Sequence, residues 1–295
     1  MSLLQSIILG VIQGLTEFLP ISSSGHLAIC KYIFGLEETG IFFDILLHVG
    51  TLIAVFAVYY RDIWELIVNA FGIIGAVFHN LGVFFKRFGK SFEEKEELLY
   101  SPVLSTPHRR FVLLIIVSSI PVGIVGFLFD DFIEGVSKGL LVPGICFLIT
   151  GILLLLAEIV DAGQKGLKNI TFPNAIVIGI AQACAVFPGI SRSGATISTS
   201  LMCGIKNEIA VKYSFILSIP VILGAALKSS LDVIQGEVEI SGSVGIYAAG
   251  AVVAAIVGYA AIRLLLVIVK KRKFKYFAFY CFAIGLVSIV GSFFI

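Results

Sequence analysis

Long apolar stretches alternate with short polar ones along the whole chain. Six of the apolar stretches are candidates for helices that cross a bilayer, which takes about 20 predominantly apolar residues. They cover residues 45–60, 111–129, 140–157, 213–227, 243–262 and 276–295. The pattern predicts an all-α polytopic membrane protein with six transmembrane helices.

Two further apolar segments are broken by proline, glycine and serine. The first break lies at Pro20 and residues 22–25, and the second lies at Pro188 and Gly189. Apolar pieces too short to cross flank each break, namely 1–12 and 27–34, then 174–187 and 193–205. Irregular backbone at membrane depth is tolerated only where protein or a watery cavity covers it. Each broken segment therefore predicts a re-entrant helical hairpin.

Composition supports the membrane class and narrows the partners. Only 14% of the 295 residues are charged, against about 25% in a typical soluble domain. The basic residues form no patch interleaved with aromatic side chains, so we expect no nucleic-acid partner. The five cysteines are scattered without paired spacing, which argues against a disulfide framework or a zinc site.

The distribution of lysine and arginine predicts the orientation of the spans. The basic run 270–275 marks the cytoplasmic side, because cytoplasmic loops carry an excess of Lys and Arg. Counting spans backward puts the acidic turn 130–134 outside and the loop 61–110 in the cytoplasm. This count requires that 66–85 lie at the cytoplasmic interface instead of crossing. The first hairpin then enters from outside, at the turn 37–38, and the second enters from the cytoplasm.

The chain is thus predicted to contain two units, each a hairpin followed by three spans, that have opposite orientations in the membrane. This arrangement is an inverted-topology repeat. The predicted architecture is a single integral membrane domain over residues 1–295. Repeat 1 covers about 1–160 and repeat 2 about 172–295, with a cytoplasmic loop at about 61–110. Such repeats hold their binding sites near the bilayer midplane, where the two halves meet.

The two breaks carry the same motif, 169 residues apart. Residues 13–27 and 182–196 align without a gap. The identical pairs are Gln13/Gln182, Phe18/Phe187, Ile21/Ile190, Ser22/Ser191, Ser24/Ser193 and Gly25/Gly194. The copies differ in their ionisable residues, since Glu17 and His26 occur in the first and Arg192 in the second. One site shared between the two halves is the simplest expectation.

The first copy offers acid–base and cation-binding groups. Gln13 and Glu17 are four residues apart and share one helix face, where they could supply oxygen ligands for Mg²⁺ or Ca²⁺. His26 could act as a nucleophile or as a general acid or base. Ser23 could be a nucleophile that His26 activates, or water could attack instead. The other histidines, His48, His79 and His108, are expected to be structural.

Both copies also offer donors for an anion. Serines at the start of a helix cap it, and the same geometry points backbone N–H groups at a bound anion. The arginine adds a planar cation suited to phosphate. The predicted substrate-binding residues are Ser22, Ser24, Gly25, Gly189, Ser191, Ser193 and Gly194, with Arg192 as the cation. A phosphate or diphosphate on a lipid is the ligand class that uses all of these groups.

The two motifs resemble those of the undecaprenyl-diphosphate phosphatase family, also called the bacitracin-resistance proteins. The resemblance rests on 13–26, read Gln-Gly-Leu-Thr-Glu-Phe-Leu-Pro-Ile-Ser-Ser-Ser-Gly-His, and on 188–196, read Pro-Gly-Ile-Ser-Arg-Ser-Gly-Ala-Thr. It implies an enzyme of the bacterial plasma (inner) membrane that hydrolyses undecaprenyl diphosphate to undecaprenyl phosphate and phosphate. This reaction recycles the lipid carrier for peptidoglycan synthesis. The resemblance also implies a divalent cation and an active site that opens to the outer face.

The motif positions carry the family's expected roles onto this chain. The acidic motif of the family has Glu or Gln, three residues and then Glu, and this chain has the Gln form, Gln13 and Glu17. With one carboxylate fewer, the cation is expected to arrive with the substrate diphosphate. The expected catalytic residues are Glu17, His26, Arg192 and Ser23, with Gln13 and Glu17 as cation ligands.

A transporter or flippase of a polyprenyl phosphate lipid is the alternative, alone or together with hydrolysis. Inverted repeats with broken helices are also how secondary transporters are built. Catalysis predicts phosphate release in detergent, whereas transport predicts flux in sealed vesicles without covalent change. A structural scaffold leaves the duplicated polar motif unexplained. The oligomeric state is open, and a homodimer is one option.

Overall fold

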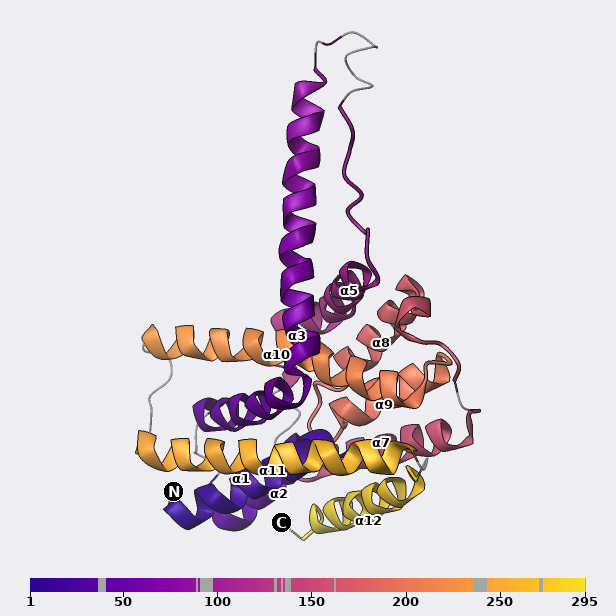
Figure 1. The fold of residues 1–295 in the computed structure, drawn as a ribbon. Coiled ribbons are helices and arrows are strands. Elements are labelled where there is room, and N and C mark those ends of the chain that lie inside the picture. Colours follow the sequence, from indigo (N-terminus) through magenta and orange to yellow (C-terminus); the bar gives the residue numbers. More distant parts are fainter. Residues whose placement is uncertain are drawn as a thin grey trace.

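The computed structural model of the protein describes residues 1–36, 41–88, 90, 98–129, 132–133, 135, 139–161, 163–235, 243–270 and 273–294. These residues form α-helices, one short 3-10 helix and a single isolated β-bridge. The helices are α1 (Leu3–Phe18), α2 (Ser23–Phe34), α3 (Ile41–Lys86), α5 (Pro107–Leu128), α7 (Leu141–Ile159), η1 (Leu167–Asn169), α8 (Phe172–Cys184), α9 (Arg192–Met202), α10 (Asn207–Ile234), α11 (Val244–Lys270) and α12 (Lys275–Gly291). Figure 1 shows most of them stacked side by side.

Five helices, α3, α5, α7, α10 and α11, are long and apolar enough to cross a membrane. The prediction of an all-α protein with several membrane-spanning helices is therefore confirmed. The sixth predicted span corresponds to α12, which is apolar but has only 17 residues. The first arms of the predicted hairpins, α1 and α8, are apolar helices of 16 and 13 residues.

The helices around each break extend further into the polar motif than their apolar pieces suggest. α1 continues to Phe18, so Gln13 and Glu17 are helical, and α2 already begins at Ser23. The reason is local, because the Ser22 side chain accepts a hydrogen bond from the backbone N–H of Gly25 and caps α2. Only a few residues around Pro20 are therefore left as irregular backbone.

The first helix of each half packs against a long helix of the other half. α1 lies along α11, and α8 lies along α5, while α7 packs on α12 and α3 on α10. Glycines permit the close crossings. A Cβ added at Gly179 in α8 would lie 2.6 Å from the carbonyl oxygen of Ser118 in α5. A Cβ at Gly14 in α1 would lie 2.8 Å from the carbonyl oxygen of Ala254 in α11.

α3 bends sharply at Tyr59, whose φ of −110° and ψ of 25° are not helical. Beyond the bend the helix leaves the stack and runs across the direction of α10 and α11 (Figure 1). The predicted span 45–60 reaches this bend, and the helix itself continues through Arg61 and Asp62 to Lys86. Asp62 is paired instead, accepting a bond of 2.7 Å from Lys212 Nζ in α10.

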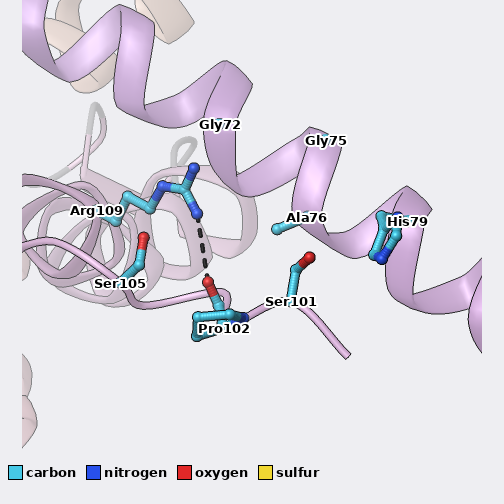
Figure 2. Close-up of a pocket in the computed structure, with 8 residues that line it drawn as sticks. All are labelled: Gly72, Gly75, Ala76, His79, Ser101, Pro102, Ser105 and Arg109. Carbon is cyan, nitrogen blue, oxygen red and sulfur yellow. Dashed lines mark hydrogen bonds between the residues drawn. The ribbon is translucent and has the colours of Figure 1, made fainter. Parts of the chain in front are cut away.

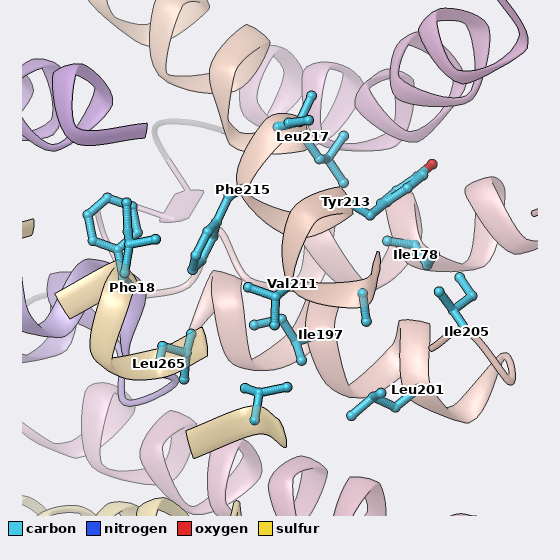
Figure 3. Close-up of a cluster of buried hydrophobic side chains, with 14 of the residues drawn as sticks. Phe18, Ile178, Ile197, Leu201, Ile205, Val211, Tyr213, Phe215, Leu217 and Leu265 are labelled. Carbon is cyan, nitrogen blue, oxygen red and sulfur yellow. The ribbon is translucent and has the colours of Figure 1, made fainter. Parts of the chain in front are cut away.

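The main apolar core surrounds the first half of α10 and joins the two halves of the chain. Its buried side chains come from every long helix of the chain, and Figure 3 shows those of α1, α8, α9, α10 and α11 around the start of α10. The ring of Phe18 packs edge-on against that of Phe215, with 5.2 Å between centroids. Because Phe18 follows Glu17 directly, this packing fixes the end of α1 at the first motif.

Several charged turns that predict the orientation lie outside the described residues. These are the turn at 37–38, the acidic residues of 91–97, residues 130, 131 and 134, the acidic residues 237 and 239, and residues 271–272. The orientation of the spans therefore stays a prediction.

Candidate active site

The two broken segments meet in the structure. Ser22 Oγ accepts a hydrogen bond of 3.2 Å from the backbone N–H of Gly189, which belongs to the second break. In return, Ser193 Oγ donates to the carbonyl oxygen of Leu19 at 3.4 Å. Both serines are buried. The duplicated motifs thus form one contiguous polar region inside an apolar protein.

Glu17 is the centre of this region. One carboxylate oxygen, Oε1, accepts a hydrogen bond from Arg192 Nη2 of the second motif. The other, Oε2, accepts from Ser23 Oγ at 2.5 Å and from Gln13 Nε2 at 3.0 Å. The glutamate is only 6% exposed. A buried carboxylate needs such partners, because an uncompensated buried charge is strongly destabilising.

Two polar atoms beside the ion pair of Glu17 and Arg192 have no hydrogen-bond partner within the described part of the chain. They are Arg192 Nη1 and Gln13 Oε1, and both are buried. A buried unpaired donor or acceptor costs about 1–3 kcal/mol, so such atoms are usually satisfied by a ligand, water or an ion. Here one is a cationic donor and the other a neutral oxygen acceptor.

The oxygen atoms of this region fit the needs of a divalent cation only in part. Gln13 Oε1 and Glu17 Oε2 are the hard oxygen ligands that Mg²⁺ and Ca²⁺ prefer. Among the described residues, no group of three or more His, Cys, Asp or Glu side chains comes together to hold a metal ion. Glu17 is also already paired with Arg192. The set therefore fits an ion that takes most of its remaining ligands from a diphosphate and from water.

His26 is held on both ring nitrogens. Nδ1 lies 2.6 Å from the carbonyl oxygen of Ser22, so this nitrogen must carry the proton. Nε2 lies 2.6 Å from the hydroxyl of Tyr280 in α12, which donates to it when the imidazole is neutral. The ring also packs edge-on against Phe147 in α7, with centroids 5.2 Å apart.

The hypothesised pair of Ser23 with His26 is not formed in the described structure. Ser23 Oγ donates to Glu17 instead, and both nitrogens of His26 are bonded to other groups. The reason is the helical geometry of α2. Ser23 and His26 are one turn apart, yet the serine faces α1 and the histidine faces α7 and α12. If Ser23 has a base, the geometry indicates Glu17.

The remaining predicted substrate-binding residues form the two helix starts. Ser22 Oγ and Ser24 Oγ lie 3.3 Å apart, and Ser191 Oγ and Ser193 Oγ lie 3.2 Å apart. Gly25 and Gly194 donate their backbone N–H groups to the capping serines at 3.3 Å and 3.0 Å. Gly189 has a φ of 100°, which favours glycine.

Three further residues reach this region from other helices. His48 Nε2 in α3 lies 3.6 Å from Glu17 Oε2, and Tyr280 holds His26. Thr150 Oγ1 in α7 donates to the carbonyl oxygen of Gly189 at 3.0 Å and accepts from the N–H of Ser191 at 2.9 Å. It therefore ties down the second break.

Sequence reasoning missed these three residues, although one carried a signal. Asp44, His48 and Thr51 recur at spacings of four and three within an apolar stretch, which puts them on one helix face. A polar face on a membrane span indicates a buried polar partner. Tyr280 and Thr150 are single polar residues in apolar runs, and only the packing of α12 and α7 brings them to the motifs.

Comparison with known proteins identifies the family. The profile of the family described as bacitracin resistance protein BacA matches residues 6–287. The chain is 40% identical to the undecaprenyl-diphosphatase of Methanosphaera stadtmanae over 292 residues, which covers 99% of both chains. It is 39% identical to the undecaprenyl-diphosphatase of Desulforapulum autotrophicum, again covering 99% of both chains. It is 38% identical to undecaprenyl-diphosphatase 4 of Bacillus cereus strain ZK, covering 99% of this chain and 98% of that protein. The chain therefore belongs to the BacA bacitracin-resistance family.

Proposed function

We propose that this protein is a membrane diphosphatase that hydrolyses undecaprenyl diphosphate to undecaprenyl phosphate and phosphate. The observation that carries the proposal is the contact of Glu17 in one motif with Arg192 in the other. That contact leaves a buried cationic donor and a buried oxygen acceptor without partners among the described residues. The relatives named above are undecaprenyl-diphosphatases, which supports the same activity. In this role the protein recycles the lipid carrier for peptidoglycan synthesis.

The proposed architecture is a single integral membrane domain of two inverted repeats, about 1–160 and 172–295. Each repeat has one re-entrant hairpin and three spans, and the site opens to the outer face of the plasma membrane. The exchanged packing of α1 on α11 and of α8 on α5 supports a two-fold relation between the halves. The repeated capping of α2 by Ser22 and of α9 by Ser191 supports it further.

Substrate binding is assigned to Arg192 and the two helix starts. Arg192 Nη1 is the proposed donor to a phosphate oxygen, while Nη2 holds Glu17. The first backbone N–H groups of α2 and α9 have no intrahelical partner and favour an anion. A divalent cation bound with the diphosphate, held by Gln13 and Glu17, would neutralise charge on the phosphate oxygens. The polyprenyl tail would lie against the apolar spans.

Glu17 is the proposed proton acceptor in the attack on the terminal phosphorus. Its Oε2 lies 2.5 Å from Ser23 Oγ, which is the distance of a strong charge-assisted hydrogen bond. The attacking oxygen is Ser23 or a water next to it, and in both cases the bond between the terminal phosphorus and the bridging oxygen breaks and undecaprenyl phosphate leaves. Attack by Ser23 forms a phosphoserine, which water then hydrolyses to release phosphate. His26 bonds the carbonyl oxygen of Ser22 at the start of α2 and the hydroxyl of Tyr280 in α12, so it is proposed to hold the two helices together at the site. Positioning and charge stabilisation supply most of the catalysis in phosphoryl transfer.

The test is phosphate release from a long-chain isoprenyl diphosphate by the purified protein in detergent. Wild-type protein is measured with Mg²⁺ and with a chelator, beside the variants Glu17→Ala and His26→Ala. Cation-dependent release that both substitutions strongly reduce is the expected result. No release by a folded wild-type protein would contradict the proposal. Flux of a polyprenyl phosphate in sealed vesicles would then identify a transporter instead.

A further inference from the structure

Residues 60–86, the part of α3 beyond the bend at Tyr59, form a helical arm that projects from the stack (Figure 1). At 1.5 Å per residue the arm is about 40 Å long. Its stretch from residue 66 to residue 85 contains no charged residue. An exposed apolar surface of this size is expected to contact lipid or protein and not water.

A stripe of large apolar side chains runs along this arm. Its members recur at alternating spacings of three and four residues, so they lie on one face of the helix. They are Trp64, Ile67, Phe71, Ile74, Phe78, Leu81 and Phe85, and their exposed fractions lie between 41% and 70%. We call this set the arm stripe.

The opposite face of the arm carries two asparagines, Asn69 and Asn80, and is covered by the chain itself. Asn80 exchanges two hydrogen bonds with the backbone of Ser101, and Asn69 accepts a bond of 2.8 Å from Thr106 Oγ1. A cleft of about 370 Å³ lies between the arm and the segment 101–109, with His79 and Arg109 on its walls (Figure 2). Arg109 donates to the carbonyl oxygens of Pro102 and Val103 and so holds the backbone of this segment in place.

We propose that the arm lies in the plane of the membrane and binds the lipid surface through the arm stripe. The arm starts where the span of α3 ends and turns across the direction of α10 and α11, so it runs along the bilayer if they cross it (Figure 1). An amphipathic helix in this position buries its apolar face about 5–10 Å into the boundary of headgroups and acyl chains. The face with Asn69 and Asn80, together with the segment 101–106 that covers it, then lies on the water side.

Charge supports a lipid surface as the partner. Lys86, Arg87 and Lys90 follow the end of the arm stripe. Such clusters attract the anionic headgroups of the cytoplasmic leaflet, by about 1 kcal/mol for each residue near the surface.

A second copy of the chain is the competing partner, because a stripe with this spacing could also form a coiled coil. Coiled coils carry charged residues beside the seam to set partner and register. The arm has no charged residue beside the arm stripe from 66 to 85. The exposed side chains of Val68, Val77 and Phe84 instead widen the apolar surface of the arm. The lipid surface fits this broad, uncharged face better.

Tryptophan fluorescence tests the proposal, because Trp64 is the only tryptophan of the chain. The variant Trp64→Phe/Phe78→Trp moves the reporter to the far part of the arm stripe. The matched control Trp64→Phe/His79→Trp places it one residue further, on the wall of the cleft. Both full-length proteins are reconstituted into phosphatidylcholine–phosphatidylglycerol vesicles with bromine high on the acyl chains. Unchanged thermal unfolding midpoints in detergent verify that both variants fold.

The expected result is that bromolipid quenches the reporter at position 78 at least about twofold more strongly than the one at 79, since only the first reaches the acyl boundary. Weak and equal quenching of both reporters would overturn the proposal. So would a Phe78→Trp protein that sediments as a dimer and becomes monomeric on Phe71→Glu, since the arm stripe would then bind a second copy. The result does not depend on the diphosphatase activity.

Discussion

The start of α2 in the first motif and the start of α9 in the second are built by the same contacts. In each, a serine caps the helix by accepting from the N–H of a glycine three residues later. The hydroxyl of that serine also lies within 3.3 Å of the hydroxyl two residues on. The backbone before the helix differs. Ser22 has a φ of 67°, the only positive φ among described residues other than glycine, whereas Ser191 has −72°.

This difference separates the roles of the two copies. Residues held in sparsely populated backbone regions store about 1–3 kcal/mol each and persist where the surroundings enforce them. The strained copy is the one that carries Glu17 and His26, and its Ser22 bonds to the second break and to His26. The relaxed copy contributes Arg192. The two motif copies thus share their capping contacts and differ in the ionisable residues that they contribute.

The largest effect is expected from removing the cation of the second copy. Arg192→Ala would leave Glu17 as an uncompensated buried charge, at a cost of about 3–5 kcal/mol, and would remove the unpartnered donor Nη1. Phosphate release should fall by about 10²–10³-fold. Arg192→Lys is the control, since it restores the charge without the planar fork and should recover folding more than activity. Full activity of Arg192→Ala would contradict the assigned role.

A smaller effect should separate the two capping serines. Ser22→Ala loses a cap worth about 1 kcal/mol and also the acceptor of the Gly189 N–H, which costs about 1–3 kcal/mol more if that donor stays buried. Ser191→Ala loses the cap alone. Thermal unfolding in detergent should therefore rank Ser22→Ala below Ser191→Ala. Replacing alanine by glycine should recover more stability at 22 than at 191, and equal recovery would argue against strain at Ser22.

The smallest effect concerns the hold on His26. Tyr280→Phe removes a hydrogen bond of 2.6 Å, worth about 0.5–1.5 kcal/mol, so kcat/KM should fall by roughly 3–10-fold. Tyr276→Phe, one turn earlier on α12 and exposed, should leave kcat/KM unchanged. In a His26→Ala background Tyr280→Phe should have no further effect. An equal loss in both backgrounds would mean that Tyr280 acts without His26.

Much of the fold could be predicted from the sequence because apolar length and helix breakers are local signals. The positions of the helices and both breaks follow from them. The bend at Tyr59 could not be predicted, since no proline or glycine marks it and a charged pair suggested an end instead. Asp62 is tolerated there only because Lys212 of a distant helix pairs with it.

The candidate site, like the fold, could be predicted only in part. Differences between the motif copies predicted that Glu17 and Arg192 belong to one site, and the structure brings them into contact. Their catalytic roles stay predictions. Ser23 contacts Glu17, whereas the sequence offered His26 as one possible partner, because the direction of a side chain around α2 depends on how α1, α7 and α12 pack. The contributions of His48 and Thr150 depend on tertiary packing for the same reason.

The most direct test of the shared site is a double-mutant cycle across the two copies. Phosphate release from a long-chain isoprenyl diphosphate is measured for Glu17→Ala, Arg192→Ala and the double variant, with Val186→Ala as the control at the position equivalent to Glu17. Residues that act as one unit are strongly non-additive. The account predicts that the double variant is no slower than the slower single variant and that Val186→Ala is close to wild type. A double variant whose loss equals the product of the two single losses would contradict a site shared by both halves.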